Sequence, residues 1–252
     1  MSKFLVLSSW FLVAGASCAQ DARQIVTESQ DRARSKSQRY EGTLEVIGSS
    51  SKISLKRWTY ERIGAFGASK SILRFTAPPE VKGVALLIVN HTDRASDQWM
   101  WTPAIERDRR IALQDRSTRF FGTDFSFEDL EERDVNQYDY KMLGDETIDG
   151  AACWKIESKP KESKSSQYSS SLLSIRKDNY VTAQIESFVK DKLVRRIHYS
   201  ELEKIDNIWT PRTVEILDVG RNNRTVLKLE KLQYNVPMKD EDFTIEALRR
   251  GY

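Results

Sequence analysis

The chain has 252 residues, of which 31% are charged and 39% hydrophobic, and its formal net charge is +3. This length suffices for one large domain or two small ones, and the near balance of charge gives no indication of nucleic-acid binding. The two histidines, His91 and His198, stand far apart in the sequence, which leaves little material for a histidine metal site or a histidine-based catalytic triad.

The N-terminal residues predict export. Lys3 precedes an apolar run that begins at Phe4 and ends among small residues, which is the pattern of a secretory signal peptide. The apolar run spans about 11 residues, short of the roughly 20 that a membrane-spanning helix needs. We predict a signal peptide over residues 1–19 and one mature domain over residues 20–252. Lipidation of Cys18 is the alternative, and it would anchor the chain to a membrane.

A polar helix is expected over residues 21–39, with Asp21 as its cap and Ile25 and Val26 on a thin apolar stripe. From Tyr40 the apolar period changes to two, which is typical of strands.

Strand-like segments, separated by turn residues, fill residues 40–113 and 138–235. We expect about ten to twelve strands in an antiparallel meander, which at this number must curl or close. The continuous apolar run at 83–90 predicts a strand buried on both faces. The Ser/Lys-rich residues 158–171 predict an exposed, mobile loop, and residues 240–250 can form one or two helical turns.

Residues 120–134 break the strand pattern, because four phenylalanines and six carboxylates lie close together there. The carboxylates belong to Asp124, Glu128, Asp129, Glu131, Glu132 and Asp134. Calcium loops place oxygens at alternate positions around a glycine, and this spacing is absent. We therefore expect no metal site but a short amphipathic helix, capped by Asp124 or Ser126, with its acids facing water.

Clustered aromatic residues indicate either ordinary core or an apolar ligand cavity with a cover. Trp99 and Trp101 are two apart and therefore share one face of a strand. The candidates for the cavity or its lid are Trp99, Trp101, Phe120, Phe121, Phe125, Phe127 and Leu130.

The arginines that follow Trp101 have two interpretations. Arg107, Arg109 and Arg110 either protect an edge strand by their charge or dock an anionic partner. Cys153 lies in an apolar, strand-like run, where a cysteine behaves as a small hydrophobic residue.

Several enzyme signatures are absent from the sequence. It contains no G-x-S-x-G elbow, HExxH motif, paired C-x-x-C, P-loop or dinucleotide fingerprint. We therefore expect no enzyme, no cofactor and no metal.

Several segments together resemble the LolA-like outer-membrane lipoprotein-sorting family of Gram-negative bacteria. They are DQWMWTPAIERDRRI, FFGTDFSFEDLEE, LGDETIDGAACWKIESKPK, IWTPRTVEILDV, NRTVLKLEKLQYN and FTIEALRRG. The resemblance implies a mainly β (α+β) fold, a half-open antiparallel barrel with an N-terminal helix and a short helical lid over a hydrophobic cavity. It also implies a periplasmic carrier of lipoprotein acyl chains.

We therefore predict a monomeric periplasmic protein that binds acyl chains of lipoproteins or other lipids. Its partners would be an inner-membrane RND-type or ABC-type transporter and an outer-membrane acceptor, with no nucleic acid. Two alternatives remain open. One is a lipid-acting hydrolase in the same barrel, with Asp124 or Glu128 in general acid–base roles. The other is a ligand-free envelope adaptor that serves an RND-type transporter and docks through its arginine strand.

Overall fold

The computed structural model describes residues 21–162 and 164–250, so the expected signal peptide and Cys18 lie outside the described residues. Thirteen strands form one sheet in which every neighbouring pair is antiparallel. The strands are β1 (Ser37–Ile47), β2 (Ile53–Ala65), β3 (Ala68–Ala77), β4 (Ala85–Val89), β5 (Asp97–Thr102), β6 (Arg107–Arg110), β7 (Tyr138–Ile148), β8 (Ala151–Pro160), β9 (Ser170–Arg176), β10 (Thr182–Val189), β11 (Lys192–Ile205), β12 (Ile208–Asp218) and β13 (Asn223–Tyr234).

The sheet consists of two antiparallel meanders that are joined where β1 pairs with β13. Its order is β6-β5-β4-β3-β2-β1-β13-β12-β11-β10-β9-β8-β7, so β1 pairs with β13 and joins the two halves of the chain. In the described part of the chain the outer strands β6 and β7 do not pair with each other, and the sheet stays open. The predicted fold class is confirmed. The strand number is one above our range of about ten to twelve.

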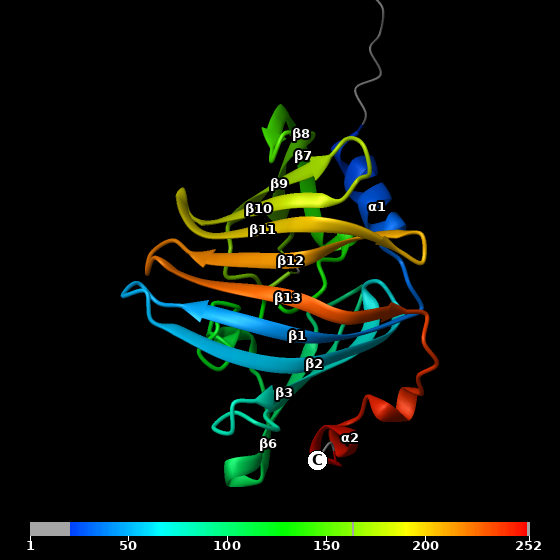
Figure 1. Ribbon diagram of the computed structural model, residues 1–252. Coiled ribbons are helices and arrows are strands. Elements are labelled where there is room, and N and C mark those ends of the chain that lie inside the picture. Colours follow the sequence, from blue (N-terminus) through cyan, green and yellow to red (C-terminus); the bar gives the residue numbers. More distant parts are fainter. Residues whose placement is uncertain (1–20, 163, 251–252) are drawn as a thin grey trace, which may run out of the picture.

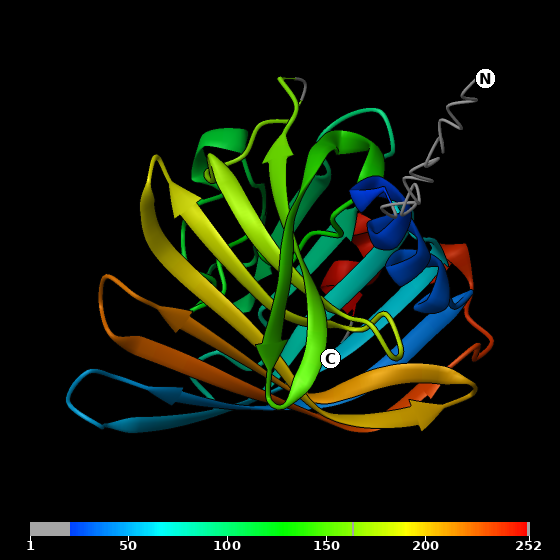
Figure 2. The same ribbon diagram turned by 90° about the horizontal axis from the view of Figure 1, so that it is seen from above.

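The sheet is strongly curved, and its strands wrap around an interior (Figures 1 and 2). The main core contains inward-facing side chains such as Leu44, Trp58 and Leu86. A smaller core on the other face contains Leu87 and Leu248. Leu86 and Leu87 alternate between the two cores, so β4 is buried on both faces, as predicted.

Two α-helices flank the sheet. Helix α1 (Ala22–Arg32) begins with Asp21 as its N-cap, whose side chain accepts a hydrogen bond from the backbone N–H of Arg23 at 3.1 Å. It buries Ile25 and Val26, as expected, and ends before residue 39 because β1 already begins at Ser37.

Helix α2 (Ile245–Arg250) packs against β4 and β5 and confirms the expected C-terminal turns. Four short 3-10 helices complete the elements. They are η1 (Pro103–Ile105), η2 (Leu113–Asp115), η3 (Val135–Gln137) and η4 (Asp240–Asp242).

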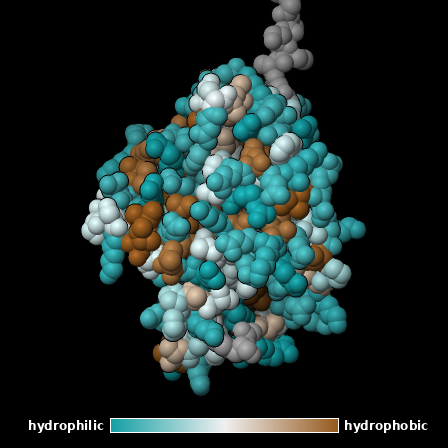
Figure 3. Space-filling model, viewed as in Figure 1, coloured by the Kyte–Doolittle hydropathy of each residue, from teal (hydrophilic) through white to brown (hydrophobic). Residues whose placement is uncertain are grey.

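The outer surface is mostly hydrophilic, and apolar side chains gather where the β1–β2 and β12–β13 hairpins end (Figure 3). Ile53, Leu55 and Val219 are exposed there. Cys153 is fully buried, and burial raises the pKa of its thiol, as expected for a structural cysteine. Among the described residues, no helix combines the length and apolarity that crossing a membrane requires.

Candidate functional site

A cavity of about 730 Å³ lies between helix α1, residues 128–133 and the inner face of the sheet from β7 to β12. Apolar side chains from all three regions form much of its wall. They are Val26, Leu130, Leu173, Ile175, Ile185 and Ile197. Trp209, at the start of β12, also lines the cavity and is 42% exposed, so the cavity reaches the surface there. The wall also carries many polar and charged side chains, among them Gln30, Arg133 and Lys204. A space that combines apolar walls with polar groups is typical of a small-molecule or lipid site.

Tyrosines supply most of the polar groups on the sheet side of the cavity. Burial raises the pKa of Tyr60 to about 12 and that of Tyr199 to about 12. Burial also raises the pKa of Tyr140. These phenols are therefore neutral at physiological pH, and they can donate or accept a hydrogen bond without bringing a charge into the cavity.

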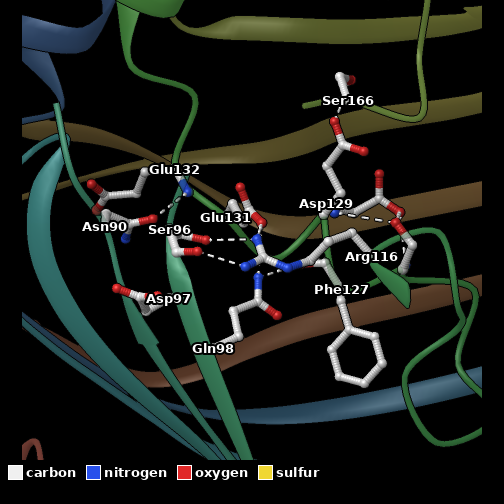
Figure 4. Close-up of polar contacts among 12 residues, drawn as sticks. Asn90, Ser96, Asp97, Gln98, Arg116, Phe127, Asp129, Glu131, Glu132 and Ser166 are labelled. Carbon is white, nitrogen blue, oxygen red and sulfur yellow. Dashed lines mark hydrogen bonds and ion pairs between the residues drawn. The ribbon is translucent and has the colours of Figure 1, made fainter. Parts of the chain in front are cut away.

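The acidic segment, residues 124–134, crosses the inside of the curved sheet and forms one wall of the cavity. Glu131 lies at its centre, where its Oε1 pairs with Nη1 of Arg116 and its Oε2 accepts from Nζ of Lys164 at 2.9 Å. Gln98 Nε2 donates to Glu131 Oε1 at 3.0 Å. Figure 4 shows the guanidinium of Arg116 held between Glu131 and Ser96. One carboxylate thus forms ion pairs with two buried cations.

Asp129 and Glu128 connect the acidic segment to the loop after β8. Asp129 Oδ2 accepts from Arg195 Nη1 at 2.9 Å, and its Oδ1 accepts from the hydroxyl of Tyr168 at 2.7 Å. Glu128 accepts from the hydroxyl of Ser166, and its Oε2 accepts from the backbone N–H of Gln167 at 2.8 Å. Our expectation of an exposed, mobile loop is wrong for Lys164 to Tyr168, because carboxylates that are distant in sequence hold this stretch.

The remaining carboxylates of the segment are also held. Asp124 is fully buried and pairs with Arg119, while its Oδ2 accepts from Thr225 Oγ1 at 2.8 Å. Glu132 pairs with Arg62 of β2 and accepts from the backbone N–H of Gly67 at 2.7 Å. The expectation that these acids face water is therefore wrong. Buried carboxylates are stable here because cations and N–H donors replace the lost water.

The helix expected within 126–134 is also absent, because Phe127–Leu130 form only a turn. Asp129 Oδ2 accepts from both the backbone N–H and the hydroxyl of Ser126, at 2.7 and 2.6 Å, as a helix-start motif would. The chain then leaves the helical path after the bond from Glu131 N to Glu128 O. We attribute this to the ion pairs of Glu131 and Glu132, which point in different directions.

The phenylalanine candidates lie mainly in the core and not at this cavity. Phe120 stacks on Phe75 at a centroid distance of 5.2 Å, and Phe125 lies 6.0 Å from Trp58. Phe127 contacts Phe120, and Phe121 packs against the same cluster from a half-buried position. Each of these rings fills space between the acidic segment and β2 or β3, which removes them from the cavity wall.

Leu130 is the one candidate among the described residues that lines the cavity. Trp99 and Trp101 do share one face of β5, as predicted, but this face packs against Phe243 in the smaller core outside the sheet. The alternation that places both indoles together also directs them away from the cavity. A ligand-binding role for the seven candidates stays a prediction.

The arginine candidates lie on β6, at one edge of the sheet. Arg110 pairs with Asp97, Arg109 lies 3.9 Å from Asp115, and Arg107 is exposed. Such charges suit the protection of an edge strand from further pairing. A docking role for these residues stays a prediction.

Sequence reasoning missed the cavity wall on β9 to β11 and the cation Arg133. The period-two pattern of β9 and β11 could have indicated this wall, because residues two apart share one face of a strand. Leu173 and Ile175 form one such pair, and Ile197 and Tyr199 form another. No local pattern distinguished Arg133 from the other arginines. Within the described residues no cluster of three or more His, Cys, Asp or Glu side chains has the arrangement of a metal site.

Comparison with solved structures shows which class of protein has this arrangement. A domain from Vibrio parahaemolyticus described as an outer membrane lipoprotein-sorting protein superposes with a TM-score of 0.86 at 23% identity, covering 91% of this chain and 98% of that one. A DUF1329 family protein from Desulfovibrio piger gives a TM-score of 0.86 at 27% identity, with coverage of 90% and 97%. A LolA superfamily protein from Nitrosomonas europaea gives 0.71 at 20% identity, with coverage of 90% and 99%.

The open, curved sheet with its N-terminal helix and interior cavity therefore defines a LolA-like fold, and the predicted resemblance is confirmed. A family model described only as an uncharacterized protein matches residues 67–250. The chain belongs to that family. No curated protein matches the chain.

Proposed function

We propose that this protein is a periplasmic carrier that binds acyl chains of lipoproteins or other lipids in the cavity beneath α1. The observation that carries the proposal is a cavity of about 730 Å³ whose wall joins aliphatic side chains from α1, the acidic segment and the sheet. Its volume falls within the range of roughly 300–1,000 Å³ that is usual for small-molecule sites.

The energetics of chain burial are adequate for such a carrier. Each methylene that leaves water contributes about 0.8 kcal/mol, so a chain of roughly 14 methylenes contributes on the order of 11 kcal/mol. Association and ordering cost roughly 4–15 kcal/mol. The two terms are of similar size, which favours binding that is reversible, and a carrier must release its cargo.

The solved relatives support a role in outer-membrane lipoprotein sorting or lipid export. The Vibrio parahaemolyticus domain is described as a lipoprotein-sorting protein. We propose that this chain acts as a monomer that receives its cargo from an inner-membrane RND-type or ABC-type transporter and delivers it to an outer-membrane acceptor. Transfer requires only that the acceptor bind the cargo more tightly than the carrier does.

The proposal contains no catalytic step. A hydrolase in this barrel would need a carboxylate free to exchange protons with a substrate. Asp124 is fully buried against Arg119, and Glu128 accepts hydrogen bonds from Ser166 and Gln167. These contacts support structural roles for both carboxylates.

Two measurements test the carrier proposal. The mature protein, purified without detergent from a Gram-negative host, is extracted with organic solvent, and the extract is examined for lipid by mass spectrometry. Uptake of the fluorescent fatty acid cis-parinaric acid is then measured with the delipidated protein. We expect bound lipid and saturable uptake.

A matched pair of variants locates the binding. Ile197 lines the cavity, whereas Ile105 is 64% exposed on η1. Ile197→Phe should lower the uptake at least severalfold because it fills the cavity, and Ile105→Phe should leave it unchanged. A lipid-free protein that takes up no parinaric acid would refute the carrier, and equal uptake by both variants would refute the location.

A further inference from the structure

One cation at the cavity, Arg133, forms no ion pair with a carboxylate of the described residues. Arg133 lines the cavity, and its Cζ lies 4.6 Å from the ring centroid of Tyr138. Its side-chain hydrogen bond is a long one, from Nη2 to the hydroxyl of Ser158 at 3.4 Å. Within the described residues, no carboxylate oxygen comes within 4.0 Å of it.

The other arginines around the acidic segment differ in this respect. Arg62 pairs with Glu132, Arg116 with Glu131 and Arg195 with Asp129, and each of these three arginine side chains is less than one-tenth exposed. The fold therefore supplies a carboxylate to the neighbouring buried guanidinium groups, and Arg133 is left without one.

The acids closest to Arg133 in sequence are directed elsewhere. Glu131 and Glu132 hold their own arginines, and Asp134 caps η3 by accepting from the backbone N–H of Asn136 at 2.7 Å. Glu128, which also lines the cavity, is held by the loop after β8. The position next to Arg133 therefore stays open to an anion from outside the chain.

Arg133 remains charged in this position. Burial lowers its pKa, but the neighbouring Tyr138 and Tyr140, together with the more distant carboxylate of Glu128, outweigh that effect, and the pKa stays above its ordinary value. A buried, charged guanidinium is unfavourable unless it finds a partner. The π face of Tyr138 offsets part of this cost, and it leaves the planar N–H edge with only the long hydrogen bond to Ser158.

We propose that the cavity takes an amphiphile with an acidic headgroup, whose carboxylate or phosphate pairs with Arg133 while its chain lies along Leu173, Ile175 and Ile197. This inference rests on the proposed carrier function and names the cargo class within it. Guanidinium suits such a group because its N–H donors can form two parallel bonds to one carboxylate or phosphate.

The test compares an acid with its neutral ester. Binding of cis-parinaric acid and of its methyl ester is measured by fluorescence for the delipidated wild type, Arg133→Gln, Arg133→Lys and Arg32→Gln. Arg32 is the matched control, because it also lines the cavity but its guanidinium already pairs with Glu28 at 2.7 Å. Thermal unfolding of each variant checks that it folds.

A charge-assisted pair contributes roughly 1.5–3 kcal/mol, which corresponds to about tenfold to a hundredfold in affinity. The wild type and Arg32→Gln should prefer the acid by at least this lower factor. Arg133→Gln should lose the preference through weaker acid binding while its ester affinity stays the same, and Arg133→Lys should keep part of it. Equal affinity of the wild type for acid and ester, or an unchanged preference in Arg133→Gln, would overturn the inference.

The source of the anion is resolved by displacement. Oleate and lysophosphatidic acid compete with bound parinaric acid, beside the neutral lipid monoolein. Stronger displacement by lysophosphatidic acid assigns a phosphate headgroup, and stronger displacement by oleate assigns a carboxylate. Displacement by monoolein as strong as either would overturn the acidic headgroup but leave the carrier intact, whereas a wild type that binds neither acid nor ester would overturn both.

Discussion

Glu131 is the residue whose charge the acidic segment can least lose. Its carboxylate pairs with both Arg116 and Lys164, and the three side chains are 4%, 7% and 3% exposed. Glu131→Gln leaves two buried cations without a counter-charge. Removal of one partner from a buried ion pair costs roughly 3–5 kcal/mol, and we expect a loss of this size in the free energy of unfolding.

Urea denaturation followed by tryptophan fluorescence measures the effect. Glu28→Gln is the control, because Glu28 pairs with Arg32 at 2.7 Å while both side chains are more than 40% exposed. Such a surface pair contributes about 0–1 kcal/mol. The triple variant Arg116→Met, Glu131→Met, Lys164→Met removes all three charges together and should recover most of the loss.

A small loss in unfolding free energy for Glu131→Gln would refute this reasoning. If Glu131→Gln unfolds within about 1 kcal/mol of the wild type, as Glu28→Gln should, then water or another carboxylate already neutralises the two cations. If the triple variant is no more stable than Glu131→Gln, the loss reflects packing and not unpaired charge.

Two further predictions concern other parts of the fold. Burial alone would raise the pKa of Asp97, but hydrogen bonds from Arg94, Arg110 and His91 hold it well below its usual value. Because the folded-state pKa is lowered, the ionised Asp97 stabilises the protein above the unfolded-state pKa of about 3.9. This stabilisation is lost progressively as the pH falls from that value toward the folded-state pKa. Asp97→Asn should therefore destabilise the protein at pH 7 and flatten the fall in unfolding free energy between pH 5 and 3; an equally steep fall would contradict this. Leu248, on α2, is fully buried in the smaller core, so Leu248→Ala should cost about 2–5 kcal/mol. The change should also shift tryptophan emission to the red as Trp99 and Trp101 meet water, and an unshifted spectrum would count against that packing.

Local patterns were enough to predict the strands, α1 and the placement of Trp99 and Trp101. Period-two alternation is a property of each strand by itself, and the cap at Asp21 is a property of its own neighbours. The same patterns indicated an antiparallel meander, because turn residues followed each strand. The pairing of β1 with β13 needed the whole chain.

The surroundings of the acidic segment could not be predicted in this way. A run of acidic residues with apolar residues at intervals predicts an amphipathic helix whose carboxylates face water. The partners here are Arg62 on β2 and Arg195 on β11, which the sequence places 70 residues before Glu132 and 66 residues after Asp129. Alternation likewise gives the face on which Ile197 lies, but not whether that face is filled or left as a cavity.

The placement of charge also separates the structural part of the molecule from the part that can select a ligand. Three carboxylates of the acidic segment form ion pairs with buried arginines; they belong to Glu131, Glu132 and Asp129. The tyrosine hydroxyls around the cavity stay neutral because burial raises their pKa values. An apolar chain alone would not distinguish one lipid from another, since methylenes contribute by area and not by identity. Discrimination must then come from polar groups that the fold leaves unsatisfied, because the absence of their partner is what costs free energy. Arg133 is such a group, so ligand preference should follow the charge of the headgroup more closely than the length of the chain.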